Sequence, residues 1–238
     1  MINKIKQVIK KLPIAFTKNQ RYDAQTIRIL RKICQPDSNC IDVGCHKGEM
    51  LDKILIFAPK GQHFCFEPLP DLYEGLIQKN YPPNCHFFQT ALSYEKGTTS
   101  FNYVISNPSY SGLLRRRYDR MDEEDTLITV KTDLLDNIIP ADMPLNFIKI
   151  DVEGAEMLVL KGAEKTIKRC HPIVVFEHGL GGSDVYGTTP KQIFAFFEKC
   201  GMKISLMKNW LDKKPPLSIA AFEEQYYQSK NYYFIAYP

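Results

Sequence analysis

The segment Asn39–Glu49, which reads NCIDVGCHKGE, constrains the fold more than any other stretch of the chain. The apolar run that ends at Val43 is typical of a buried strand, and Gly44 and Gly48 bracket a tight turn. Beyond Gly48, apolar residues recur with helical spacing. A strand that turns through glycines into a helix exposes backbone N–H groups and lets a ligand approach the backbone closely. The segment therefore predicts a ligand site at the first strand–helix turn of an α/β domain.

The composition of this turn indicates which ligand it suits. Its G-x-x-x-G spacing differs from the G-x-G-x-x-G of dinucleotide dehydrogenases. An acidic residue just before the first glycine favours a cationic ligand and disfavours a pyrophosphate. S-adenosylmethionine fits, because its amino-acid end carries an ammonium group. We expect the turn to supply cofactor-binding residues, namely Asp42, Gly44, Cys45, His46 and Gly48. For this motif alone, a plain strand–helix connection is the alternative.

Strand-like and helical segments alternate over most of the chain. Strand-like runs are expected over residues 40–43, 63–67, 85–89, 147–151 and 173–177, and helices over 69–79, 155–169 and 191–200. Residues 202–207 and 232–237 are expected to form a closing pair of strands, joined by a long connection. This alternation predicts an α/β fold with a mostly parallel, doubly wound sheet. One antiparallel strand is expected near the edge.

Two segments fall outside this alternation. Residues 1–36 contain helical patterns over 2–12 and 23–33, and we expect them to form an N-terminal helical extension that acts as a lid on the ligand cleft. Residues 98–105 and 126–132 predict a β-hairpin-like insertion over about 98–132. The predicted organisation is therefore an extension over 1–36 and a single catalytic domain over 37–238.

Composition narrows the class of protein. Lys and Arg exceed Asp and Glu by only four residues, too mild an excess to predict nucleic-acid binding. The seven cysteines contain no CxxC pair, which favours a reducing compartment without a zinc cluster. No apolar run is long enough for stable membrane insertion, and the lysines spread through the first twelve residues do not predict a signal peptide. The expected location is cytoplasmic.

Acidic residues follow four of the predicted strands. Ligands bind beyond the carboxyl ends of the strands in an open parallel sheet, so these residues are site candidates. Glu67, with Pro68 after it, lies about 20 residues beyond the glycine turn, where a carboxylate can accept both hydroxyls of a ribose. Residues Thr90, Ala91 and Leu92 are expected to flank an adenine ring. Helix capping is the alternative explanation for a single acidic strand end.

The longest motif is IKIDVEGAEMLVLKGA over residues 148–163. Together with the glycine turn, FEP at 66–68 and FEH at 176–178, it resembles the FkbM family of S-adenosylmethionine-dependent methyltransferases. The resemblance covers about residues 39–178 and implies a Rossmann-like, seven-stranded methyltransferase fold. It also implies an O-methyltransferase that transfers a methyl group to a hydroxyl of a small molecule or glycan. His46 departs from the family, where Asn is usual.

The catalytic candidates are Asp151, Glu177 and His178. Asp151, at the centre of the sheet edge, is expected to lie near the reactive methyl group and to contact the cofactor. His178 is the expected general base, because an imidazole titrates near neutral pH, and Glu177 would orient it or bind the acceptor. Alternatively, these three residues hold Mg²⁺ or a similar divalent cation that lowers the pKa of a substrate hydroxyl. Both mechanisms stay open at this point.

The predicted partner is a small-molecule or glycan acceptor, with no nucleic acid. Four residues are candidates for contact with the acceptor: Arg115, Glu153, Tyr186 and Trp210. The sequence leaves a homodimer open. Two other classes of protein remain as alternatives, a Rossmann-like oxidoreductase and a non-catalytic nucleoside-binding module.

Overall fold

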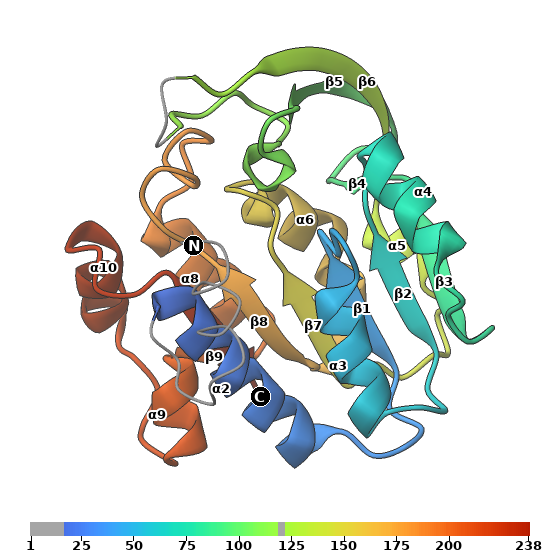
Figure 1. The fold of residues 1–238 in the computed structure, drawn as a ribbon. Coiled ribbons are helices and arrows are strands. Elements are labelled where there is room, and N and C mark those ends of the chain that lie inside the picture. The colour runs from blue at the N-terminus through green and yellow to red at the C-terminus, as the bar shows by residue number, and fades with distance from the viewer. Residues whose placement is uncertain (1–16, 119–121) are drawn as a thin grey trace, which may run out of the picture.

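The computed structural model describes residues 17–118 and 122–238, which form a seven-stranded sheet between two layers of helices (Figure 1). The strand order is β3-β2-β1-β7-β8-β10-β9. The strands are β1 (Cys40–Val43), β2 (His63–Phe66), β3 (Cys85–Phe88), β7 (Phe147–Ile150), β8 (Ile173–Glu177), β9 (Lys203–Ser205) and β10 (Tyr233–Tyr237). Only β10 runs antiparallel to its two neighbours, β8 and β9. The predicted fold class, a seven-stranded and mostly parallel sheet with one antiparallel strand, is confirmed.

Helices pack on both faces of the sheet, so the predicted doubly wound arrangement is also confirmed. One face packs against α2 (Lys18–Ile33), α3 (Glu49–Phe57) and α9 (Met207–Leu211). The other packs against α6 (Glu156–Gly162), α7 (Glu164–Cys170), α8 (Pro190–Lys199) and α10 (Ile219–Tyr227), and the remaining helices are α4 (Pro70–Gln78) and α5 (Leu135–Ile138). The long connection before β10 was predicted without helices, and it contains α9 and α10. The single helix predicted over 155–169 is divided into α6 and α7.

Side-chain alternation along β7 decides which groups reach the ligand edge. Phe147 packs in the cluster on the α2 and α3 face, whereas Ile148 and Ile150 pack in the cluster on the opposite face. Because alternate residues of a strand point the same way, Lys149 and Asp151 follow Phe147 on the α2 face. A buried apolar strand thus carries two charged side chains to the same end of one face.

The predicted hairpin-like insertion is present as a second sheet. Its strands β5 (Gly97–Val104) and β6 (Asp125–Asp133) pair antiparallel, and β4 (Ala91–Leu92) pairs with β6. A short 3₁₀ helix, η1 (Pro108–Tyr110), follows β5. In Figure 1 this sheet lies along the top of the molecule, with η1 below it.

The described part of the N-terminal extension is α2. It begins five residues earlier than predicted, where Thr17 and Gln20 form a capping box. Ile29 and Leu30 pack against the sheet, and the Tyr22 hydroxyl donates to Asn231 Oδ1 at 3.1 Å. The helix predicted over 2–12 lies outside the described residues, and the boundary at residue 36 stays a prediction. Across the described ranges, every helix is too short or too polar to cross a membrane.

Two helical glycines offer a matched test of this packing. An added Cβ at Gly162 would lie 2.0 Å from the carbonyl oxygen of Ser93, while one at Gly75 in α4 would meet no atom within 4 Å. We expect Gly162→Ala to lower the free energy of unfolding by about 1–3 kcal/mol, because a backbone segment must move. Gly75→Ala should raise it by about 0.5–1 kcal/mol through helix propensity. Urea unfolding monitored by circular dichroism measures both, and equal stability of the two variants would contradict this packing.

Candidate active site

A cleft of about 960 Å³ lies at the carboxyl ends of the central strands. The glycine turn after β1 forms one wall, together with the ends of β2, β7 and β8. Residues from α2, the insertion and α10 complete it, including Tyr22, Arg116 and Tyr226. The volume suits a drug-sized ligand. The extension and the insertion therefore both contribute to the site.

The glycine turn is held against β2 and β7 by its backbone. Gly44 has a φ of 76°, and an added Cβ would lie 2.0 Å from the Asp151 carbonyl oxygen, so only glycine fits. The N–H groups of Gly44 and Cys45 donate to the Phe66 carbonyl oxygen at 3.0 and 3.1 Å. His46 has a φ of 48°, a conformation that both Asn and His tolerate better than most residues. The departure from the family at His46 therefore preserves the backbone of the turn.

Asp42 is a buried carboxylate without a local partner. It is 1% exposed and lines the cleft, and neither of its carboxylate oxygens has a hydrogen-bond partner among the described residues. Burial raises its pKa to about 6, although the Lys149 ammonium opposes this. A buried polar group in this state fits a ligand that brings a hydrogen-bond donor or a positive charge.

Glu67 fixes the shape of the turn as well as lining the cleft. It is 5% exposed, and its two oxygens accept from the backbone N–H groups of Leu69 at 3.0 Å and His46 at 2.9 Å. Burial raises its pKa to about 7, outweighing these two hydrogen bonds. Each oxygen keeps a further lone pair for a ligand.

Most of the other predicted cofactor-binding residues also lie in this cleft. Its walls include Cys45, His46, Pro68, Thr90, Ala91 and Leu92. Gly48 does not line it. Gly48 is the N-cap of α3, and an added Cβ there would lie 2.4 Å from the Tyr81 hydroxyl oxygen. With a φ of 76°, Gly48 lets the chain pass from the turn into α3.

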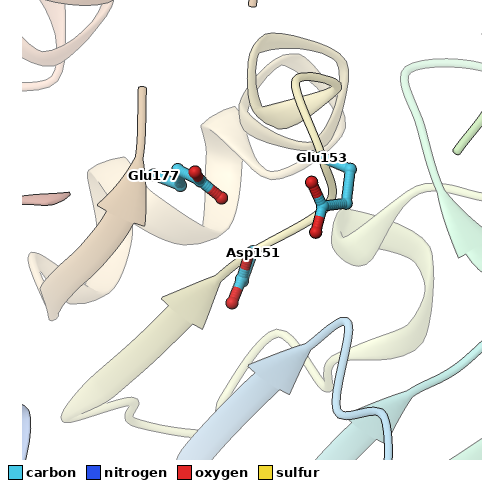
Figure 2. A group of neighbouring side chains, drawn as sticks. All are labelled: Asp151, Glu153 and Glu177. Carbon is cyan, nitrogen blue, oxygen red and sulfur yellow. The ribbon is translucent and has the colours of Figure 1, made fainter. Parts of the chain in front are cut away.

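Three carboxyl groups gather around one space at the ends of β7 and β8 (Figure 2). Oxygen atoms of Asp151, Glu153 and Glu177 all lie within 4.8 Å of one another. Asp151 Oδ2 accepts from Lys149 Nζ at 2.8 Å and from the Tyr233 hydroxyl at 2.5 Å. We call Asp151, Glu153 and Glu177 the carboxyl cluster.

The pKa values of the carboxyl cluster are shifted in opposite directions. Burial would raise the pKa of Asp151, but Lys149 and the Tyr233 hydroxyl outweigh burial and lower it to about 2. Burial and the Asp151 charge raise the pKa of Glu177 well above its ordinary value. The same two causes raise the pKa of Glu153 to about 8, although its ion pair with Arg116 opposes them. Lys149 and the Tyr233 hydroxyl therefore stabilise the ionised form of Asp151, while burial and the Asp151 charge stabilise the protonated form of Glu177.

The structure places His178 outside the cleft. Its side chain is fully buried, and its ring lies 5.7 Å from that of Phe222 and 4.6 Å from that of Tyr226. Neither ring nitrogen has a hydrogen-bond partner within the described part of the chain, and burial lowers its pKa to about 4. Adjacent residues of an extended chain point to opposite sides, so Glu177 faces the cleft and His178 faces away. We therefore do not retain His178 as the general base, nor as a metal ligand with Asp151 and Glu177.

Of the four residues predicted to contact the acceptor, one lines the cleft and three do not. Glu153 lines the cleft. The Arg115 side chain is 69% exposed and pairs with Asp125, while the adjacent Arg116 and Arg117 line the cleft instead. The Tyr186 hydroxyl accepts from the Leu114 N–H at 2.9 Å, which supports the insertion from outside the cleft wall. Trp210 on α9 packs under the Lys32 ammonium, 4.9 Å from its ring centre.

Lys149 and Tyr233 were not predicted as site residues, and from the arginines at 115–117, a solvated loop or a contact for an anionic acceptor, only Arg115 was selected. Lys149 carried a signal, because it is a lysine inside the apolar strand Phe147–Ile150, two residues before Asp151. Tyr233 carried none, since its role depends on how β10 pairs with β8. The sequence does not show which of these three consecutive arginines line the cleft, because that depends on how the loop folds; Arg116 and Arg117 line it, and Arg115 does not.

A seven-stranded sheet with an acidic glycine turn and a cleft at its carboxyl edge is the arrangement expected of an S-adenosylmethionine-dependent methyltransferase. The methyltransferase FkbM domain family matches residues 42–204, and the chain belongs to this family. The predicted family and enzyme class are confirmed, and the oxidoreductase and the non-catalytic module find no support.

Two characterised relatives are similar over most of the chain. The 2-O-methyltransferase NoeI of Sinorhizobium fredii is 28% identical over 167 residues, which cover 64% of this chain and 67% of NoeI. The hexuronic acid methyltransferase AglP of Haloferax volcanii is 25% identical over 194 residues, which cover 79% of this chain and 73% of AglP. A solved FkbM methyltransferase from Methylobacillus flagellatus is 18% identical with a TM-score of 0.43, over 60% of this chain and 33% of that one.

The position of His178 leads to a prediction about stability. Its folded-state pKa of about 4 lies below the ordinary value of 6.5, so the unfolded chain takes up a proton that the folded chain does not. The wild-type protein should therefore lose stability as pH falls from 6.5 towards 4. The loss should reach a few kcal/mol, because one pKa unit corresponds to about 1.4 kcal/mol.

His178→Phe should remove this contribution, since Phe can occupy the stack with Phe222 and Tyr226 without a titrating group. Thermal unfolding across this pH range, compared with the wild type, measures the effect. Methyl transfer by the variant should stay within about threefold of the wild type, because a general base contributes about 10²-fold or more. A hundredfold loss of turnover in the folded variant would restore His178 to the mechanism.

Proposed function

We propose that the protein transfers a methyl group from S-adenosylmethionine to a hydroxyl group of a sugar or glycan. The observation that carries this proposal is the carboxyl cluster, which lies in the same cleft as Asp42, a carboxylate with no hydrogen-bond partner in the part of the chain that the structure describes. The Asp42 carboxylate suits the cationic donor, and the carboxyl cluster can remove a proton from an acceptor. The names of the two relatives support a sugar-linked acceptor.

The chain's own residues fit the donor in three places. Asp42 suits its ammonium group, Glu67 suits the ribose hydroxyls, and Thr90 to Leu92 suit the adenine face. The close approach of Gly44 to Asp151 leaves the backbone of the turn bare beside these groups. When bound, the donor supplies an electrophilic methyl group, whose bond to sulfur breaks as the acceptor oxygen bonds to carbon. Positioning by these walls supplies much of the rate of such a displacement.

The acceptor would enter from the side formed by α2, the insertion and α10. Aromatic side chains line the cleft there, and their flat faces suit the apolar faces of sugar rings: Tyr22, Tyr110, Tyr226 and Tyr232. Arg117 also lines the cleft and makes no ion pair with a described residue, so it suits an acidic group on the acceptor. A hexuronic acid, named for one relative, carries such a group.

Glu177 is the proposed general base in place of His178. It lines the cleft, and its raised pKa makes it a better proton acceptor near neutral pH than the strongly acidic Asp151. Asp151, held by Lys149 and Tyr233, would position Glu177 and contribute negative charge near the methyl group.

The donor assignment predicts the effect of removing the Glu67 carboxylate. Glu67→Ala should weaken S-adenosylmethionine binding about tenfold or more, since a hydrogen bond to a charged group contributes about 1.5–3 kcal/mol. Calorimetric titration measures the affinity. Glu74→Ala, an exposed residue of α4, is the matched control and should bind as the wild type does. Unchanged affinity in folded Glu67→Ala would remove Glu67 from the ribose site.

The function itself is tested by transfer of labelled methyl groups to neutral and acidic oligosaccharides. We expect the protein to label at least one, and Glu177→Gln to lower kcat about 10²-fold or more while the donor still binds. Transfer should persist in EDTA, because Lys149 and Arg116 already pair with two members of the carboxyl cluster. If EDTA abolished transfer and Mg²⁺ restored it, the metal mechanism would replace this one. Labelling of non-sugar acceptors alone would contradict the acceptor class.

A further inference from the structure

The cleft contains more carboxyl groups than cations near its catalytic edge. Five carboxyl groups line it there: Asp42, Asp151, Glu153, Glu156 and Glu177. Two cationic side chains pair with these groups: Lys149 pairs with Asp151, and Arg116 pairs with Glu153. If every carboxyl group were ionised, three of the five would therefore lack a cationic partner among the described residues. A buried cluster responds to such an excess by retaining protons or by binding a positive charge.

The geometry indicates which member of the carboxyl cluster retains a proton. Oxygen atoms of Asp151, Glu153 and Glu177 lie within 4.8 Å of one another, so ionising all three groups together is unfavourable. Asp151 Oδ2 accepts from Lys149 Nζ and from the Tyr233 hydroxyl, and Glu153 pairs with Arg116. Glu177 is the member of the carboxyl cluster without a cationic partner among the described residues, so we assign the retained proton to Glu177.

We propose that Glu177 exchanges this proton for the positive charge of the methyl donor. The proton leaves when the donor's sulfonium group occupies the cleft, and a proton from the acceptor hydroxyl returns to Glu177 as that charge disappears. This inference rests on the proposed function and goes beyond it, because it makes the general base available only when the donor is bound.

The exchange balances in charge and in atoms. The acceptor O–H bond breaks, its proton goes to the Glu177 carboxylate, and the electron pair left on oxygen forms the new bond to the methyl carbon. The pair of the broken carbon–sulfur bond stays on sulfur, which becomes neutral. The site thus begins with one carboxylate beside one sulfonium and ends with both groups neutral. An opposite charge nearby lowers a carboxyl pKa by about 1–3, so the sulfonium charge favours release of the proton on donor binding.

Other groups around Glu177 set the background for this titration. They come from each element packed near it: Tyr22 and Asp23 on α2, Asp42 on β1, Arg116 on the insertion, Lys149, Asp151, Glu153 and Glu156 on β7 and the segment after it, and Tyr232 and Tyr233 at β10. Burial raises the pKa of Glu153 to about 8 and that of Glu156 to about 7, so both are further candidates for proton release. Glu153 pairs with Arg116, and Glu156 Oε1 accepts from the N–H groups of Val152 and Gly154, which holds the Glu156 side chain against the turn before α6. Variants must separate Glu177 from these groups.

The test is calorimetric titration of the whole protein with S-adenosylmethionine and with its demethylated product, S-adenosylhomocysteine. The two ligands share the ammonium, carboxylate, ribose and adenine, and differ in the sulfonium charge. Each titration is run at a pH of about 6.5 in two buffers of different ionisation enthalpy, PIPES and imidazole, so the buffer dependence of the heat counts the protons released. We expect release of about one proton with the sulfonium ligand and less than half of that with the product.

Two variants assign the proton. Glu177→Gln should still bind both ligands but lose the difference in proton release between them, whereas Glu74→Gln should behave as the wild type. Equal release with both ligands in the wild-type protein would overturn the exchange, whether or not the variant folds. An unchanged difference in folded Glu177→Gln would overturn the assignment to Glu177. Failure of both ligands to bind would instead overturn the proposed function.

Discussion

The ion pair between Lys149 and Asp151 is the interaction on which the catalytic edge depends. Both side chains leave the same face of one strand and its extension, and Lys149 Nζ lies 2.8 Å from Asp151 Oδ2. Burial alone would favour a neutral lysine and a protonated aspartic acid, and their attraction reverses both tendencies. Removing one partner would leave a buried charge unpaired, which typically costs about 3–5 kcal/mol. The pair thus favours the ionised form of Asp151 beside carboxyl groups whose pKa values are raised.

Sheet topology brings the other groups to this pair. β1 and β8 lie on either side of β7, so the ends of these three strands, Asp42, Asp151 and Glu177, share one edge. Gly44 lets the turn after β1 come close to the carbonyl of Asp151, which no larger residue could allow. β10 then returns antiparallel beside β8 and places the Tyr233 hydroxyl on Asp151. The single antiparallel strand of the seven-stranded sheet is therefore also part of the site.

The sequence predicted the donor side of the cleft better than the acceptor side, for physical reasons. The glycine turn and the strand ends are local features whose placement follows from strand alternation and parallel pairing. The acceptor side combines α2, the insertion and α10, whose contacts depend on long-range packing that periodicity does not record. The misplaced His178 has a different cause, because it directly follows Glu177 and the two point to opposite sides of the chain. Alternation alone could have excluded one of them from the cleft.

A fixed ammonium suits this reaction better than a divalent ion would. The donor is itself positively charged, and two unit charges 4 Å apart at an effective dielectric of 20 interact with about 4 kcal/mol. A divalent ion in the carboxyl cluster would add a second unit of repulsion towards the donor. Lys149 supplies only one charge, and its hydrogen bond to Asp151 holds that charge on the strand. The carboxyl cluster can then carry enough negative charge to attract the cationic donor and still retain a proton to exchange for the donor's charge.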